Sequence, residues 1–159
     1  ELYSMVYPEK SKMEIKKKVC SLLDSGHVAE RFENMVSALG GPKDFLSTYK
    51  KVLPKTKYVI PVRAKKDGYI TQIDTKALGN ILIKMGGGRQ KASDKLDWSV
   101  GFTKVAKTGK KVNTKTALLF LHIADKFFTP SLESEICDCF SISEGEPEQS
   151  KDLILQKVS

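Results

Sequence analysis

Residues 58–89 read YVIPVRAKKDGYITQIDTKALGNILIKMGGGR, and the hydrophobic period changes within this stretch. Residues 58–62 and 68–73 are short runs rich in β-branched and aromatic residues, and a polar turn at residues 65–68 separates them. Pro61 cannot donate a ladder hydrogen bond, so we expect it at a strand edge or a bulge. The first half of this stretch therefore predicts two short strands.

A helical spacing follows the second β-rich run. Asp74 or Thr75 can cap this helix at its N-terminus. The apolar residues that recur at helical spacing are Leu78, Ile81, Leu82 and Met85. Gly86-Gly87-Gly88-Arg89 comes next and opens a polar segment, residues 86–97, which we call the glycine loop. Because a helix C-terminus is the wrong end of the dipole for an anion, the glycines predict a helix cap and a flexible loop, and not a phosphate site.

Before this stretch, the chain is predicted to be helical. Apolar residues are spaced by three and four over residues 12–39, which indicates one buried stripe per helix, with a break at Ser25-Gly26. Residues 40–42 (GGP) end the second helix. Asp44 can then cap a short helix that ends before Pro54.

After the glycine loop, the chain is mainly β-rich. The expected elements are a β-rich segment at 98–106, a turn at 108–110, strands at 112 and 117–123, a helix at 132–140, a loop at 144–150 and a strand at 153–158. Helices first, then strands with interspersed helix, predict an α+β fold. We expect a helical segment at residues 1–54, followed at residues 55–159 by a β-rich domain of the hammerhead or barrel-sandwich type, with mixed strands and short helices.

The charge is unevenly distributed along the 159 residues. The net charge is +8, made up of +13 over residues 1–132 and −5 over residues 133–159. A basic body can attract nucleic acid. However, only three of the 27 basic residues are arginine, which is the better side chain for bidentate phosphate and base contacts. We therefore interpret the lysines as solvated surface and do not expect nucleic acid as a partner.

The apolar runs and the cysteines indicate where in the cell the protein is located. The longest apolar run, residues 117–124, is far shorter than the ~20 residues that a membrane-spanning helix needs, so no membrane is expected. Cys20, Cys137 and Cys139 are odd in number, and the C-x-C pair has no second ligand pair at zinc spacing. Free thiols are favoured, which predicts a cytoplasmic protein.

The residues that could act in catalysis do not occur at the spacing of a known catalytic or metal site. Neither His27 nor His122 has a carboxylate or cysteine at catalytic or metal spacing, so we interpret both as structural. Asp94 and Asp97 are interpreted as hydrogen-bond acceptors of the loop and of the strand entry, and not as general acids. We therefore assign no catalytic residue, no metal ligand and no cofactor-binding residue.

Lys76 raises a further alternative. Glycine turns between short strands are typical of the hammerhead-like barrel sandwich of biotinyl and lipoyl carriers, which present a lysine on an exposed hairpin. Residues 74–77 (DTKA) look superficially similar. Because Lys76 precedes a helical spacing, a modified carrier lysine is the less favoured interpretation.

Several blocks of sequence, in order and with few gaps, carry a family resemblance. They are RFENMV at 31–36, GGP at 40–42, LP at 53–54, GYI at 68–70, IDTKALG at 73–79, MGGGRQKASD at 85–94, Asp97, SVGFT at 99–103 and LH at 121–122. Through about Asp125 the chain resembles the C-terminal part of the thymidine phosphorylase and pyrimidine-nucleoside phosphorylase family. The last 30 residues match loosely.

The resemblance implies a two-lobed enzyme, one lobe helical and one α/β, with substrate between them. The family cleaves thymidine with phosphate, giving thymine and 2-deoxyribose 1-phosphate, and its phosphate- and base-binding residues lie upstream of this region. We therefore expect the chain to be inactive alone and its partner to be the missing N-terminal part of the same enzyme. A start at Glu1, without methionine, agrees with a piece of a longer polypeptide.

The resemblance implies a structural role for this region, which would complete the α/β lobe and support lobe closure. As a hypothesis, the glycine loop faces the cleft between the lobes, and Arg89 and Asp97 hold it there. The residues concerned are Gly86, Gly87, Gly88, Arg89 and Asp97. The alternative is a stand-alone basic module that binds nucleic acid or a protein partner, for which an affinity falling steeply with salt is the distinguishing property.

Overall fold

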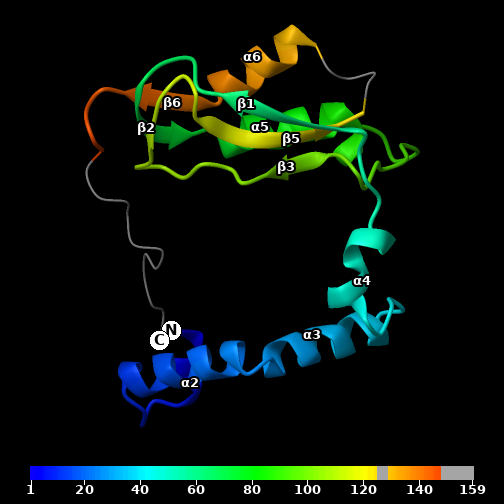
Figure 1. Ribbon diagram of the computed structural model, residues 1–159, viewed down its shortest axis with the longest axis vertical. Helices are drawn as coiled ribbons and strands as arrows, with labels where there is room; N and C mark the ends of the chain where they lie inside the picture. The colour runs from blue at the N-terminus through cyan, green and yellow to red at the C-terminus, as the bar shows by residue number, and fades with distance from the viewer. Residues whose placement is uncertain (125–128, 148–159) are drawn as a thin grey trace. The chain divides into compact units, whose positions relative to one another are not determined.

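The computed structural model describes residues 1–124 and 129–147, and the chain divides into two compact units, Glu1–Leu53 and Pro54–Ser159. The first unit contains helices, and all strands of the described residues lie in the second (Figure 1). The α+β class predicted from the sequence is confirmed. None of the helices in the described ranges is long and apolar enough to cross a membrane.

Four helices build the first unit: α1 Leu2–Val6, α2 Lys12–Asp24, α3 His27–Ala38 and α4 Phe45–Val52. α2 begins with a capping box, in which the Ser11 hydroxyl oxygen accepts from the Glu14 backbone N–H and the Glu14 carboxylate accepts from Ser11. The hydroxyl and backbone bonds from Ser11 also lower the pKa of the Glu14 carboxyl group. The predicted break at Ser25-Gly26 is confirmed.

Two expectations about the first unit are wrong. Asp44 stands at the N-cap of α4, but its side chain makes no capping bond; instead, the Glu33 carboxylate of α3 accepts from the Leu46 backbone N–H at 2.9 Å. The predicted buried stripes are largely exposed, because this unit contains four helices and no sheet to cover them. Phe32 is 40% exposed and Met35 51%, and Ile15 is the one buried side chain among these residues.

The described residues of the second unit form two antiparallel three-stranded sheets. One has the order β1 Tyr58–Arg63, β5 Ala117–Ile123, β3 Gly101–Thr103, and the other has the order β4 Lys111–Val112, β2 Gly68–Ile73, β6 Phe140–Ser143. Pro61 lies in the edge strand β1, as expected, and a register shift follows it between Val62 and Arg63. The polar turn at residues 65–68 joins strands of different sheets.

The helices of this unit lie close to their predicted positions. Asp74 caps α5 Thr75–Leu82 by accepting from the Ala77 backbone N–H at 2.8 Å, and a short π-helical turn, η1 Ile83–Gly87, continues it.

The last helix of the described residues, α6 Pro130–Asp138, begins and ends two residues before the predicted helix at 132–140, because Phe140 already begins β6. Strand β6 was not predicted, and the β-rich segment at 98–106 is reduced to the three residues of β3. The predicted strand at 153–158 lies outside the described residues.

One apolar core joins the two sheets and both helices. α6 packs on β1 and β6, as Figure 1 shows. Members of the core come from both sheets and from α5, η1 and α6, and those that are completely buried include Val62, Ile70, Leu118, Leu119, Leu121, Ile123 and Ile136. This core fixes the position of α6 and of the helix that precedes the glycine loop. A barrel-sandwich arrangement of the two sheets stays a prediction.

Candidate functional site

The glycine loop leaves the helix through a backbone conformation that only glycine adopts easily. Gly86 has φ +93°, which ends the helical run and confirms the predicted cap. A Cβ added to Gly87 would lie 2.6 Å from Leu82 Cδ1, so no larger residue fits there without a shift. The Gly86 carbonyl then accepts from the Asp97 backbone N–H at 2.9 Å and closes the loop.

Two aspartates hold the interior of the loop. The Asp94 carboxylate accepts from the backbone N–H groups of Gln90, at 3.0 Å, and Lys91, at 2.8 Å. Asp97 Oδ1 accepts from the backbone N–H and the hydroxyl of Ser99. Both carboxylates are thus the acceptors that the sequence predicted, and these bonds fix the loop conformation.

Unlike the two aspartates, Arg89 does not contribute to the hydrogen bonds that hold the loop. It follows Gly88, whose backbone is extended, and its side chain is exposed. With the residues that the structure describes, this side chain makes no hydrogen bond or ion pair. Gly86 and Asp97 therefore hold the loop from within, and a contact of Arg89 with another part of the protein stays a prediction.

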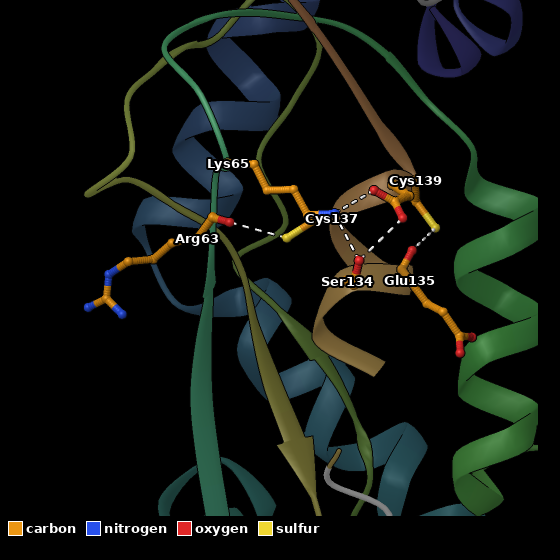
Figure 2. A network of polar contacts seen from close by, with 7 residues as sticks. Arg63, Lys65, Ser134, Glu135, Cys137 and Cys139 are labelled. Atoms are coloured by element: carbon orange, nitrogen blue, oxygen red, sulfur yellow. Dashed lines mark hydrogen bonds and ion pairs between the residues drawn. The ribbon is translucent and has the colours of Figure 1, made fainter. Parts of the chain in front are cut away.

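A second polar cluster surrounds the C-terminal turn of α6 and was not predicted. Lys65, in the turn after β1, donates to Asp138 Oδ1 at 2.6 Å and to Ser134 Oγ at 2.9 Å (Figure 2). Lys84 of η1 pairs with Glu135 at 3.2 Å. We call these contacts the α6 clamp, because they tie the helix to the turn after β1 and to η1.

The Lys65–Ser134 pair resembles the base and nucleophile of a hydrolase in spacing alone. A general base must lose its proton near neutral pH. The hydrogen bond to Asp138 instead raises the pKa of Lys65, so the ammonium group keeps its proton. Ser134 is consequently not activated. Lys65 and Asp138 are largely exposed, so their ion pair orients α6 and stabilises it little.

The two cysteines of α6 and its C-cap are buried thiols. Cys137 Sγ donates to the Arg63 carbonyl at 3.2 Å, and Cys139 Sγ donates to the Glu135 carbonyl at 3.3 Å (Figure 2). Burial raises the pKa of both thiols, which disfavours the reactive thiolate. All three cysteines are free, as predicted. The described ranges also contain no cluster of His, Cys, Asp and Glu that could hold a metal ion.

Two open cavities flank the end of α6. One, of about 340 Å³, is lined by Lys65, Lys66, Leu118, Cys137, Asp138, Phe140 and Ile142. The other, of about 410 Å³, is lined by Asp74, Ala77, Asn80, Ile81, Lys84, Glu135, Asp138 and Cys139. Asp138 lines both, but it is bound by Lys65. Each cavity contains a cysteine thiol and at least one carboxylate, but burial raises the pKa of Cys137 and of Cys139 and disfavours the thiolate, so neither thiol is an activated nucleophile.

The remaining candidates have local structural partners. His122 Nε2 is hydrogen-bonded to Thr103 Oγ1 at 2.8 Å, between neighbouring strands, and His27 Nδ1 to Ser25 Oγ at 2.7 Å. These contacts agree with the structural interpretation of both histidines. Lys76 lies in the first turn of α5 and not on a hairpin, so the carrier interpretation loses its structural basis.

The second unit is thus an α+β domain with one shared core, a fixed glycine loop and a clamped α6. Residues 69–143 match the family described as the pyrimidine nucleoside phosphorylase C-terminal domain. The family resemblance that the sequence indicated is thus confirmed for residues 69–143.

The match does not cover the whole folded unit. It begins in β2 and ends at the last residue of β6, so it contains both helices of the unit and the glycine loop. β1 precedes it, yet β1 pairs with β5 from Tyr58 opposite Ile123 to Arg63 opposite Ala117. Lys65 of the α6 clamp also precedes it. The unit therefore needs residues before the matched range to complete one sheet and to hold α6.

Proposed function

We propose that this chain is the C-terminal region of a pyrimidine nucleoside phosphorylase that cleaves thymidine with phosphate, giving thymine and 2-deoxyribose 1-phosphate in the cytoplasm. The family match over residues 69–143 carries the proposal. A domain described as C-terminal implies an N-terminal part of the same enzyme, and that part is the proposed partner and the proposed site of substrate binding.

The role proposed for this region is structural. Residues 1–54 are assigned to the α/β lobe and residues 55–159 to the C-terminal β-rich domain. The exposed apolar residues of the first unit support this assignment, because such a face is usually covered in the complete protein. The glycine loop is proposed to face the cleft between the lobes. Its internal bonds support that position, since a fixed loop can orient Arg89 toward another surface.

Phosphate-dependent release of thymine tests the proposed function. We expect no turnover by the 159-residue chain, once its intact mass has been confirmed. The longer polypeptide that contains it should show enzyme-like turnover. Turnover by the chain alone would place the active site within these residues and contradict the proposal. Nucleic-acid binding that falls steeply with salt, without phosphorolysis by either polypeptide, would favour the basic binding module instead.

Arg89→Ala in the longer polypeptide tests the position of the loop. We expect kcat to fall by about 10- to 100-fold, because misplaced cleft residues impair turnover even when they lie away from the chemistry. The thermal midpoint should hardly change, since Arg89 is exposed and makes no polar contact within the described ranges. Lys91→Ala, at another exposed cation of the loop, is the matched control. Unchanged kinetics of Arg89→Ala would contradict the proposed position of the glycine loop in the cleft.

A further inference from the structure

One end of the second unit collects basic side chains from segments that are distant in the sequence. Residues 63–69 and 107–116 contain seven cations and one carboxylate, and we call these two segments the lysine end. The cations, all of them exposed, are Arg63, Lys65, Lys66, Lys107, Lys110, Lys111 and Lys115. Spacing along the sequence does not show that the two segments meet, so the sequence indicated only solvated lysines.

Hydrogen bonds bring the two segments side by side. The Ala64 backbone N–H donates to the Thr116 carbonyl at 3.1 Å, and the Thr114 backbone N–H donates to Asp67 Oδ1 at 3.1 Å. Figure 1 shows both segments at the same end of the unit. The cations of the lysine end therefore belong to one region of the surface.

The turn at residues 107–110 is fixed in the same way. The Gly109 backbone N–H donates to the Ile70 carbonyl at 2.8 Å, and the Ile70 backbone N–H donates to the Lys110 carbonyl at 3.1 Å. Lys111 pairs with Tyr69 across β4 and β2, and its Nζ lies 5.7 Å from the centre of the Tyr69 ring. A fixed backbone loses less conformational entropy when its side chains bind a partner.

The cations of the lysine end outnumber the carboxylates near them. Lys65 is paired with Asp138, and the other six cations form no ion pair with the described residues. The carboxylates are Asp67 and, just after β6, whose last residue pairs with β2, Glu144 and Glu146. Six cations thus stand against three carboxylates. Their mutual repulsion is relieved when a polyanion binds.

The composition of the lysine end favours one class of polyanion. Protein interfaces are depleted in lysine and depend on apolar and aromatic anchors, whereas the exposed side chains here are all polar or charged. Stable attachment to a membrane takes an apolar or lipid anchor in addition to basic residues. Nucleic acid differs from both, because lysine contacts with its phosphates are sufficient for sequence-independent binding.

We propose that the lysine end binds the phosphate backbone of nucleic acid, independently of base sequence. Arg63 is the one arginine among its cations, so bidentate reading of bases is not part of the proposal. With about six phosphate contacts, the affinity should fall by about 1,000-fold between about 50 and 200 mM salt. This inference does not rest on the proposed function, because it needs no phosphorolysis.

A matched pair of triple variants tests the proposal. The 159-residue chain is titrated into short fluorescent DNA duplexes of two unrelated sequences, and anisotropy gives the affinity at several salt concentrations. Lys66→Gln/Lys107→Gln/Lys110→Gln should reduce the slope of log affinity against log salt by about three, one for each lost phosphate contact. These lysines lie in exposed turns, so the urea midpoint should stay close to that of the parent chain.

The control removes the same charge from the first unit. Lys16→Gln/Lys17→Gln/Lys18→Gln, at exposed positions of α2, should leave the slope unchanged. Equal losses in the two triple variants would show that the net charge of the chain, and not the lysine end, attracts the duplex, and would overturn the proposal. A strong preference for one duplex sequence would also overturn it, as would binding to phosphatidylserine vesicles without binding to DNA.

Measurements on the longer polypeptide separate this inference from the proposed function. Phosphorolysis without salt-dependent binding of DNA would refute the inference and keep the function. Binding that depends on the lysine end, without phosphorolysis, would support the inference and refute the function. Both activities together would support both.

Discussion

Replacing Gly68 by alanine is expected to lower the free energy of unfolding of the second unit by about 3 kcal/mol, since backbone strain and overpacking act together. Gly68 has φ +146°, a conformation that side chains rarely adopt. Its added Cβ would also lie 2.4 Å from the Ser143 carbonyl oxygen of β6 and 2.9 Å from Ile142 Cγ2. Because the nearest atom belongs to the backbone, the clash is relieved only if β2 and β6 separate.

The chain offers a matched control at Gly79, in the middle of α5. A Cβ there would meet no atom within 4 Å, and the residue is helical. Gly79→Ala should therefore raise stability by about 0.5–1 kcal/mol, because alanine favours the helix. Urea unfolding followed by far-UV circular dichroism measures both variants. Equal midpoints for Gly68→Ala and the parent chain would show that β6 does not pair tightly with β2.

The parts of the fold that the sequence predicted depend on neighbouring residues. Helices α2 and α3 follow from apolar spacing and from the break at residues 25–26, and α5 follows from the cap at Asp74. The glycine loop is similar, because Asp94 bonds residues three and four positions away. Local signals of this kind can be read without knowing the fold.

The parts that were missed depend on distant residues. Ile136 and Phe140 are four apart and favoured helix, whereas Phe140 pairs with Ile73 of β2 and begins β6. The α6 clamp joins Lys65 to Asp138 across 73 positions, so no local pattern indicates it. The apolar stripes of α2 and α3 were identified as stripes, but spacing alone does not tell which surface covers them.

α6 holds the second unit together through its buried face more than through its polar contacts. Ile136 is completely buried, and it belongs to the core cluster that includes residues of both sheets. The ion pairs of the α6 clamp are exposed and screened by solvent, so they orient the helix at little gain in stability. Removing the buried side chain should therefore cost far more than removing Lys65.

Ile136→Ala is expected to destabilise the second unit by about 2–5 kcal/mol, because it removes buried methyl groups and leaves a cavity. Ile136→Val, which removes one methylene group, should cost about 0.5–1.5 kcal/mol. Lys65→Met keeps most of the length of the side chain without its charge, and its unfolding midpoint should stay close to that of the parent chain. Urea unfolding followed by circular dichroism gives all three values. If Lys65→Met lowered the free energy of unfolding as much as Ile136→Ala, the α6 clamp, and not the core, would hold α6 in place.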